Sequence, residues 1–503
     1  MKKAVPLMIQ GTHSDAGKSA LVTALCRIFV QDGFKTAPYK SQNMALNSYI
    51  TLDGKEIGRA QGVQAEAAGI AATTDMNPIL IKPTGEYKSQ IVVHGAPYKN
   101  MQAGAYREEF YDQGLQIIEQ SYSRLANQFE RIVIEGAGSP AEINLNDREL
   151  VNMRVAQIAN APVILVGDIE KGGVFASLVG TLQLLHPEDR KRVVGVFINK
   201  FRGDVTLLEP GLTWFEEYTG VPVLGVIPYI HDLMIEAEDS VVLSKYSTNQ
   251  DDSKEIDIAV IRFPMISNFT DVDPFFNEPD CHVRFVKKAE ELGEPDLVIL
   301  PGSKNTIEDM MFIDNNGLSN QILQLAEKGV TMIVGICGGY QMLGNTIDDK
   351  YRVESTHSEK AGLGLIPMKT SLTQKKMTVQ SEGVAELGEQ KISVTGYEIH
   401  MGESHYQHTH TPFIRLADRV DGYISSSKAL IGTYFHGIFH NDQLREVLLN
   451  EIRRKKGLDL VHNRVSFAQK KEEGFELLAK VVRENIKLDR INEVMIQFQR
   501  HTN

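Results

Sequence analysis

The sequence predicts an α/β protein with two domains, the first of them a doubly wound parallel sheet that carries helices on both faces. Its 503 residues exceed the length at which a single hydrophobic core keeps growing. The first half alternates short apolar runs with amphipathic stretches, which is the order that builds a parallel sheet with helices on both faces, and the second half contains further buried-type apolar runs. Residues 245–254 are polar and lack apolar periodicity, which indicates a linker between the two domains.

The first predicted domain covers residues 1–244. Its elements follow the order of a doubly wound sheet, in which helices join consecutive strands. The candidate strands are residues 5–10, 36–40, 131–135, 163–168, 193–199 and 223–227. The candidate helices are residues 18–31, 57–72, 105–127 and 174–185.

The second predicted domain covers residues 255–450, and residues 368–395 within it have the pattern of antiparallel hairpins. Residues 451–503 carry helical spacing, and we expect them to form an extension packed on this second domain. The candidate buried strands are residues 258–262, 283–286, 297–300, 332–336 and 431–435.

Charge and cysteine content exclude several classes of function. The net charge of −12 argues against a nucleic-acid partner, because phosphate backbones need a basic surface. No stretch approaches the roughly 18–20 apolar residues of a membrane span, and the N-terminal segment lacks the pattern of a signal peptide. Three scattered cysteines form neither a disulfide framework nor a zinc pattern, so we expect a reducing cytoplasm. The sequence gives no oligomeric state.

A phosphate-binding loop is predicted between the first strand and the first helix, in the segment GTHSDAGKS. Backbone amides and a helix N-terminus at this position can surround phosphate oxygens. Five residues separate the two glycines, one more than in the common pattern, so a plain strand-to-helix turn is the alternative. We expect Lys18 to contact the phosphates of ATP and Ser19 to bind Mg²⁺. The residues predicted to bind ATP in this loop are Gly11, Thr12, Asp15, Ala16, Gly17, Lys18 and Ser19.

Loops of this longer form resemble those of the dethiobiotin synthetase-like group, whose members phosphorylate a carboxylate. The resemblance implies that Lys40, in APYK, is a second phosphate-binding lysine and that Glu135, in VIEGAGSP, is the acidic Mg²⁺ ligand. Open parallel sheets place ligands at such strand ends. For Glu135 the alternative is a solvated loop carboxylate. Asp168 is a weaker candidate of the same kind, and it could equally cap the turn that follows it.

A nucleophile is predicted at Cys337, in GICGGYQMLG. It lies between an apolar strand and a helix, the geometry of a nucleophile elbow, and a helix N-terminus favours the thiolate. The glycines around Cys337 distinguish it from Cys26 and Cys281, for which a buried hydrophobic role is the expectation.

The expected base is His436, in GTYFHGIFHN near the end of a later strand. A cysteine followed by a histidine in this order resembles the class I glutamine amidotransferases, and LPGSKNT matches their oxyanion loop. The resemblance implies an oxyanion site formed by backbone amides at Gly302, Ser303 and Gly338. Most of that class carry a glutamate two residues after the histidine, whereas here the residue is Ile438. The group that orients His436 is therefore not predicted, and a glutaminase-like domain that only binds partners is the alternative.

The two domains together, without that glutamate, resemble the cobyrinate amidases of cobalamin biosynthesis. The resemblance covers essentially the whole chain. The segments that carry it are SQNMALNSYIT, EIGRAQGVQAEAAG, MNPILIKP, GAGSPAEINL and GYEIHMG.

The resemblance implies that L-glutamine supplies ammonia and that ATP with Mg²⁺ activates a substrate carboxylate. The implied substrate is the corrinoid adenosylcobyrinic acid a,c-diamide, amidated at its b, d, e and g side chains, and its cobalt belongs to the substrate. The alternative within the family is amidation at a and c. Amide side chains beyond the second strand are the candidate substrate contacts, although several could simply bond loop backbone: Asn43, Asn47, Gln61 and Gln64.

A rival of another class is a partitioning or scaffold ATPase, whose phosphate loop carries an additional lysine near its start. Here His13 stands five residues before Lys18. The absent lysine and the glutaminase-like half both count against this rival.

Overall fold

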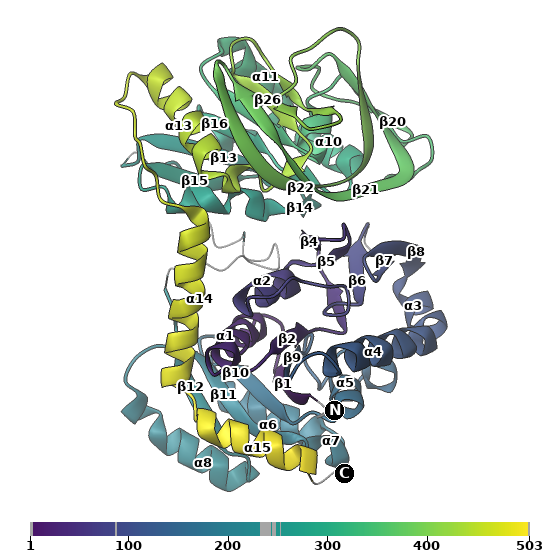
Figure 1. Cartoon of the computed structure of the whole chain (residues 1–503), viewed down its shortest axis with the longest axis vertical. Coiled ribbons are helices and arrows are strands. Elements are labelled where there is room, and N and C mark those ends of the chain that lie inside the picture. Colours follow the sequence, from purple (N-terminus) through teal and green to yellow (C-terminus); the bar gives the residue numbers. More distant parts are fainter. Residues whose placement is uncertain (1–3, 86–87, 232–242, 244–247, 252, 501–503) are drawn as a thin grey trace. The chain divides into compact units, whose positions relative to one another are not determined.

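The computed structural model describes residues 4–85, 88–231, 243, 248–251 and 253–500 (Figure 1). The chain divides into two compact units. The predicted linker, residues 245–254, lies partly outside the described residues. Among the residues that are described, no helix is both long and apolar enough to span a membrane. The first unit contains Met1–Ala45, Lys55–Ile235 and Lys471–Asn503, and the second contains Leu46–Gly54 and Glu236–Lys470.

A six-stranded parallel sheet forms the centre of the first unit, in the order β12-β11-β10-β1-β9-β2. Each strand coincides with one of the six predicted from apolar runs, so the doubly wound class is confirmed. The chain moves from β1 to one side of the sheet and later to the other, which leaves a crevice at the carboxyl ends of β1 and β9. The strands are β1 (Val5–Gly11), β2 (Thr36–Tyr39), β9 (Arg131–Glu135), β10 (Val163–Asp168), β11 (Val193–Phe201) and β12 (Val223–Pro228).

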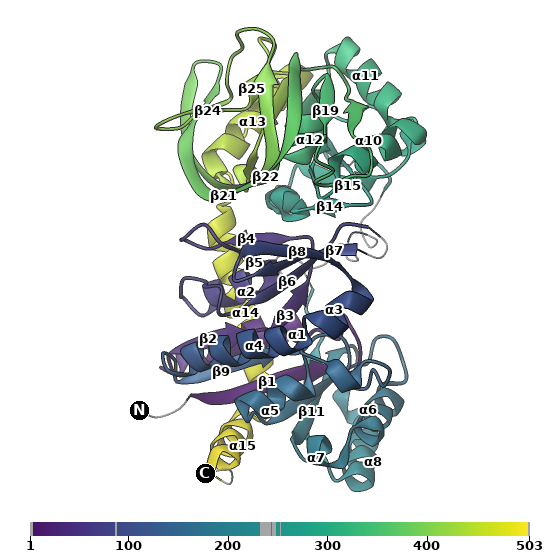
Figure 2. The ribbon, with the colours of Figure 1, turned by 90° about the vertical axis from the view of Figure 1, so that its right-hand side faces the viewer.

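Helices cover both faces of this sheet. Figure 2 shows α4 and α5 in front of the strands, on the face opposite α1. The predicted helix 105–127 is two helices that meet at Phe110. The helices are α1 (Lys18–Gln31), α2 (Arg59–Ala67), α3 (Ala103–Glu109), α4 (Tyr111–Ala126), α5 (Met153–Ala159), α6 (Val174–Leu184), α7 (Pro187–Arg190) and α8 (Glu209–Thr219), with short 3-10 turns η1 (Asn146–Arg148) and η2 (Val205–Leu207).

A second, four-stranded sheet in the first unit was not predicted. Its order is β3-β6-β7-β8, and it extends from the carboxyl end of the main sheet. Its outer strand β8 is largely exposed and polar, so the apolar pattern gave little signal there. The strands are β3 (Gln42–Met44), β6 (Ile79–Pro83), β7 (Lys88–Val93) and β8 (Ala96–Gln102); β5 (Glu56–Gly58) precedes α2.

The C-terminal helices correct one expectation. We expected residues 451–503 to pack on the second domain, and those up to Lys470 do belong to the second unit. From Lys471 onward, however, α14 (Phe467–Glu484) and α15 (Leu488–Arg500) pack on the first unit's sheet and helix α1 (Figure 1). Lys487 N donates to the carbonyl of Leu224 in β12, at 2.7 Å. An amphipathic helix must bury its apolar face, but that face does not specify which core receives it. The helix residues inside the first core are Leu478, Ala479, Val482, Ile491 and Met495.

The second unit has its own six-stranded sheet, in the order β15-β13-β16-β18-β26-β25, with only β25 antiparallel. All five predicted strands are present. The strands are β13 (Ile256–Ile261), β15 (Cys281–Val286), β16 (Leu297–Leu300), β18 (Met332–Ile336), β25 (Tyr423–Ile424) and β26 (Leu430–Thr433). The helices are α9 (Ala289–Leu292), α10 (Thr306–Asn315), α11 (Leu318–Lys328), α12 (Gly338–Met342) and α13 (Asp442–Lys456), with 3-10 turns η4 (Phe269–Asn277) and η5 (Ile438–His440).

The predicted hairpin region forms a long antiparallel pair, β21 (Met368–Leu387) and β22 (Gln390–Tyr406), which confirms its type and extends it. The segment Leu46–Gly54 also belongs to this unit, because Gln380 donates to the carbonyl of Ile50 at 2.5 Å. The first domain is therefore not one continuous stretch. The remaining strands are β4 (Ser48–Ile50), β14 (Ile266–Ser267), β17 (Gly302–Ser303), β19 (Thr346–Asp348), β20 (Glu359–Ala361), β23 (Ile414–Arg415), β24 (Val420–Asp421) and β27 (Phe435–His436).

Candidate functional site

The phosphate loop lies between β1 and α1 in the first unit, as its sequence predicts. Strand β1 ends at Gly11, and α1 begins at Lys18. Asp15 and Gly17 have positive φ values of 57° and 95°, which fold the loop back on itself. A Cβ atom at Gly17 would lie 2.0 Å from Asn199 Nδ2, so only glycine fits this close approach. Of the other predicted residues, Thr12 and Ala16 lie in the loop, and Ser19 is the second residue of α1.

Lys18 is buried at the centre of this loop. Its ammonium donates to the carbonyl of His13, at 3.0 Å, and to that of Gly138, at 3.3 Å. The second acceptor belongs to the segment that follows β9, on the other side of the crevice. A cation between these two backbone segments, beside the N-terminus of a 14-residue helix, forms an anion-binding site.

Glu135 connects two of the predicted nucleotide-site residues, Ser19 and Lys40. It ends β9, is 1% exposed, and accepts hydrogen bonds from Ser19 Oγ at 2.9 Å and Lys40 Nζ at 2.8 Å. The alternative of a solvated loop carboxylate is therefore wrong. A carboxylate and a hydroxyl beside a phosphate site are the oxygen donors that Mg²⁺ uses together with phosphates and waters. The residues present thus fit this ion, and the described part of the chain contains no cluster of three or more His, Cys, Asp or Glu that would hold a metal by itself.

A chain of buried amides leads to the same carboxylate. Gln64 donates to Glu135 Oε2 at 2.5 Å, Gln61 Nε2 lies 3.5 Å from Gln64 Oε1, and Asn43 donates to Gln61 at 3.1 Å. These three predicted substrate residues are at most 3% exposed, so they are placed to orient Glu135. The fourth, Asn47, is 2% exposed and lies in the segment Leu46–Gly54 of the second unit.

Two residues that the sequence did not single out donate hydrogen bonds to backbone carbonyls of the phosphate loop. Asn199 donates to the carbonyl of Ala16 at 2.9 Å, and Lys200 donates to the carbonyl of Asp15 at 2.7 Å. Lys200 also pairs with Asp168 at 2.7 Å, and Asp168 accepts from the amide of Glu170 at 2.9 Å. Asp168 therefore caps its turn and holds Lys200. The sequence signal for these two residues is that Asn199 and Lys200 form a polar pair at the end of the otherwise apolar strand β11.

The second site is centred on Cys337, between β18 and α12. Its φ of 52° and ψ of −107° are strained for a residue with a side chain. The turn is possible because its neighbours are small: a Cβ at Gly339 would lie 1.9 Å from the carbonyl oxygen of Leu300. The thiol lies 3.5 Å from the carbonyl oxygen of Ile399, in the GYEIHMG segment. This is the predicted nucleophile elbow.

His436 is fully buried beside this thiol, on the short strand β27 that pairs with β22. Its Nδ1 donates to Asp271 Oδ2 at 2.7 Å, and the other carboxylate oxygen accepts from the amide of Gly437 at 2.7 Å. Burial opposes a charged imidazole, but the Asp271 carboxylate and the adjacent Cys337 outweigh it and raise the pKa of His436 to about 10. The imidazole is therefore protonated at neutral pH.

Asp271 is the residue that the sequence reasoning missed. The expected position of the acid, two residues after the histidine, is occupied by Ile438, which is 1% exposed in the apolar core. The acid comes instead from η4, which precedes Cys337 in the chain by more than sixty residues. Only a search for buried carboxylates before the cysteine would have found it.

The predicted oxyanion residues converge next to this pair. A Cβ at Gly338 would lie 2.8 Å from the backbone nitrogen of Ser303, and one at Gly302 would lie 2.9 Å from a ring carbon of His436. Asp309 holds the loop, because it accepts from Ser303 Oγ at 2.5 Å and from the amide of Met265 at 3.1 Å. Burial raises the pKa of Asp309 to about 7. The arrangement presents backbone amides beside a nucleophile and a proton donor.

Comparison with known proteins agrees with the two-domain fold. Residues 7–242 match the family model described as a CobQ/CobB/MinD/ParA nucleotide-binding domain, and residues 257–444 match a CobB/CobQ-like glutamine amidotransferase domain. The fold and these matches define an ATP-dependent amide ligase that contains a glutamine amidotransferase domain.

Full-length relatives identify the family. A cobyric acid synthase of Geobacillus sp. (strain WCH70) is 63% identical over 500 residues, with 99% of both chains covered. The cobyric acid synthases of Anoxybacillus flavithermus and Geobacillus thermodenitrificans are each 60% identical, over 99% of this chain and 99% and 100% of theirs. The chain belongs to the cobyric acid synthase family.

Proposed function

We propose that this protein hydrolyses L-glutamine at Cys337 and uses the ammonia, with ATP and Mg²⁺, to amidate the b, d, e and g carboxylates of adenosylcobyrinic acid a,c-diamide. Two arrangements support the proposal. Glu135 holds Ser19 and Lys40 together at the phosphate loop. Asp271 holds His436 beside Cys337. The names of the relatives support the corrinoid substrate.

In the glutaminase reaction the thiolate of Cys337 attacks the side-chain amide carbon of glutamine. His436, which is protonated at neutral pH, donates its proton to the leaving nitrogen, and the C–N bond breaks to release ammonia. Backbone amides at Ser303 and Gly338 stabilise the oxyanion. Water then cleaves the thioester, which gives glutamate and restores the thiol.

In the synthetase reaction ATP, with Mg²⁺, supplies the phosphoryl group that activates a substrate carboxylate. Lys18 and Lys40 provide positive charge beside the phosphates, and Ser19 and Glu135 provide oxygen ligands for the ion. The amides of Gln61 and Gln64 fix the orientation of Glu135. Ammonia from the glutaminase site displaces phosphate and leaves the amide.

Amidation of cobyrinic acid a,c-diamide tests the function directly. We expect four successive mass changes of one amide each with ATP and glutamine. When cobyrinic acid is supplied instead, amidation only at its a and c side chains would overturn the choice of substrate.

The variant Cys337→Ala separates the two sites. It should lose glutamine-dependent amidation and keep amidation with ammonium salts, whereas Cys26→Ala, which alters another buried thiol, should keep both. Loss of both activities in Cys337→Ala alone would contradict the division of labour. Full glutamine-dependent activity in that variant would contradict the role of the thiol.

A further inference from the structure

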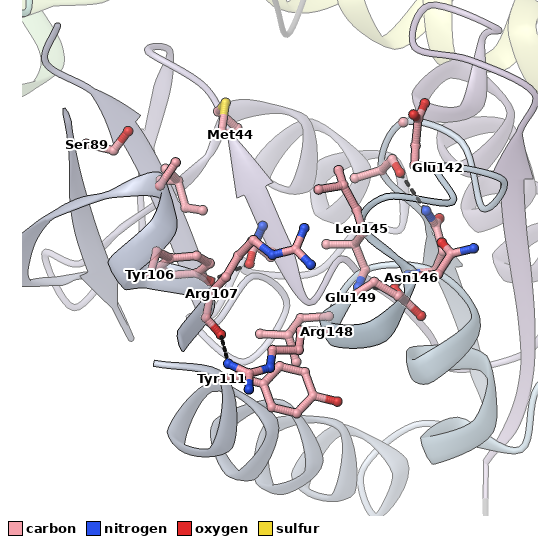
Figure 3. A pocket seen from close by; sticks show the side chains of 18 of the residues that line it. Met44, Ser89, Tyr106, Arg107, Tyr111, Glu142, Leu145, Asn146, Arg148 and Glu149 are labelled. Atoms are coloured by element: carbon pink, nitrogen blue, oxygen red, sulfur yellow. Dashed lines mark hydrogen bonds between the residues drawn. The ribbon is translucent and has the colours of Figure 1, made fainter. Parts of the chain in front are cut away.

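The first unit contains a pocket of about 490 Å³ next to the phosphate loop (Figure 3). We propose that this pocket binds one edge of the corrin ring, and that Arg107 and Arg148 bind carboxylates on that edge. The inference rests on the proposed function and adds the place where the substrate sits. We call the site the strand-end pocket, since its walls are the segment after β9, the inner face of the small sheet and the start of α3 and α4.

The pocket continues directly from the nucleotide site. Gly138 lines it, and the carbonyl of Gly138 accepts the hydrogen bond from Lys18 at 3.3 Å. The segment is fixed in place, because Asn152 donates to the carbonyl of Ala137 at 2.7 Å and Glu149 accepts from the amide of Val151 at 2.8 Å. A carboxylate on a molecule in the pocket would thus lie beside the residues expected to hold the transferred phosphate.

The floor and the rim of the pocket are apolar. Ile81, Ile91 and Met101 form buried floor positions on the small sheet. At the rim, the side chains of Met44 and Leu145 are 62% and 42% exposed, although both are large and hydrophobic. Exposed apolar groups around a cavity indicate a ligand-binding site. The volume suits a drug-sized ligand and holds only part of a macrocycle as large as corrin, so the ring would enter by its edge.

An aromatic wall favours a flat ligand. Tyr106 is stacked on Phe110 with ring centroids 5.1 Å apart, and its hydroxyl donates to Gln42. These contacts fix the ring of Tyr106 along one side of the pocket, with Tyr111 nearby (Figure 3). A rigid aromatic side chain presents a large surface to a flat conjugated ring at low entropic cost.

The charged side chains that line the pocket are Arg107, Arg148, Glu142 and Glu149. Glu149 already accepts from the backbone amides of Val151 and Asn152, at 2.8 and 2.6 Å, so the two arginines are the groups that can receive an anionic ligand. Arg148 donates to the backbone carbonyl of Arg107 at 3.3 Å, and both side chains are among those that line the pocket (Figure 3). Arg107 is paired with Asp147 at 2.5 Å, but the Asp147 side chain is 70% exposed. Such an exposed pair is weak, and a ligand carboxylate can replace Asp147 on the guanidinium. An apolar pocket with a flat wall and two guanidinium groups matches a ring that carries several carboxylate arms.

The test measures binding of cobyrinic acid a,c-diamide by its visible absorbance, in wild type and in Arg107→Gln and Arg148→Gln. A matched control is Arg124→Gln, because Arg124 also pairs with an aspartate, Asp75, but lies outside the pocket. A second probe is the fully methyl-esterified corrinoid, which has no free carboxylate. Ser89→Trp, at the pocket wall, fills the cavity without changing its charge. Thermal unfolding of each variant reports whether it folds.

Each arginine variant should bind the acid about tenfold more weakly, the loss expected for one charge-assisted hydrogen bond. The two arginine variants and wild type should bind the ester equally, and Ser89→Trp should weaken binding of both probes. Equal binding of the acid by wild type and both arginine variants, with amidation intact in wild type, would overturn the pocket inference alone. Failure of wild type to bind or amidate the corrinoid would overturn the proposed function itself.

Discussion

The carboxylate of Asp271 accepts a hydrogen bond from His436 Nδ1, at 2.7 Å, and a second from the backbone amide of Gly437, also at 2.7 Å. The carboxylate therefore fixes both the ring and the backbone that carries it. It occupies the functional place of the glutamate that the sequence lacks at position 438.

Asp271→Asn should lower glutamine-dependent activity by a factor on the order of 100 or more, because an amide neither stabilises the imidazolium nor selects its tautomer. Amidation with ammonium salts should persist. Steady-state rates with each nitrogen source provide the measurement. Asp418→Asn, at a carboxylate that is 80% exposed in the same unit, is the control. A glutaminase rate in Asp271→Asn equal to that of the control would show that the pair has no role.

The same pair should make stability depend on pH. The folded pKa of His436, about 10, lies above the ordinary value of 6.5, so the protonated imidazole contributes stability that is complete below about pH 6.5. This contribution is lost as the pH rises toward 10. The difference in unfolding temperature between wild type and Asp271→Asn should therefore be largest near pH 6.5 and shrink by pH 10. A difference that is constant or grows with pH would contradict the assigned pKa.

Glu135→Gln should reduce ATP-dependent amidation by a factor on the order of 100 to 1,000, because it removes a charged ligand from the phosphate-transfer site. Glutamine hydrolysis occurs in the other unit and serves as the internal reference. Amidation rates at several Mg²⁺ concentrations measure the effect. The control is Glu119→Gln, at an exposed carboxylate of helix α4. Unchanged Mg²⁺ dependence in Glu135→Gln would exclude Glu135 as a ligand.

Leu478→Ala should destabilise the first unit by about 2–5 kcal/mol, because Leu478 is 2% exposed in that unit's core. Leu477→Ala is a matched control, since the adjacent leucine is 44% exposed. Hydrogen exchange during urea unfolding distinguishes the two units. Loss of protection confined to the second unit would contradict the observed packing of α14.

The sequence predicted the parallel strands of both main sheets because these strands are mainly apolar runs buried on both faces, but it missed the two-residue antiparallel edge strand β25. It predicted the two loops as well, since the strand-loop-helix order and the glycines of a phosphate loop and a nucleophile elbow occur within a few residues. The atoms that require Gly17 and Gly339, Asn199 Nδ2 and the carbonyl oxygen of Leu300, come from distant segments that only the structure shows. The small sheet β3-β6-β7-β8 was missed because its exposed outer strand lacks apolar alternation.

The sequence by itself determined the fold class, the positions of Lys18 and Cys337 and, through resemblance, the family. Tertiary structure alone decided that Asp271 supports His436, that the amides of Asn43, Gln61 and Gln64 lead to Glu135, and that α14 and α15 belong to the first core. The physical reason is the separation along the chain of the residues that determine each feature. Periodicity and turn geometry depend on neighbours in the chain, whereas a buried hydrogen bond or a helix contact depends on which distant segments fold together.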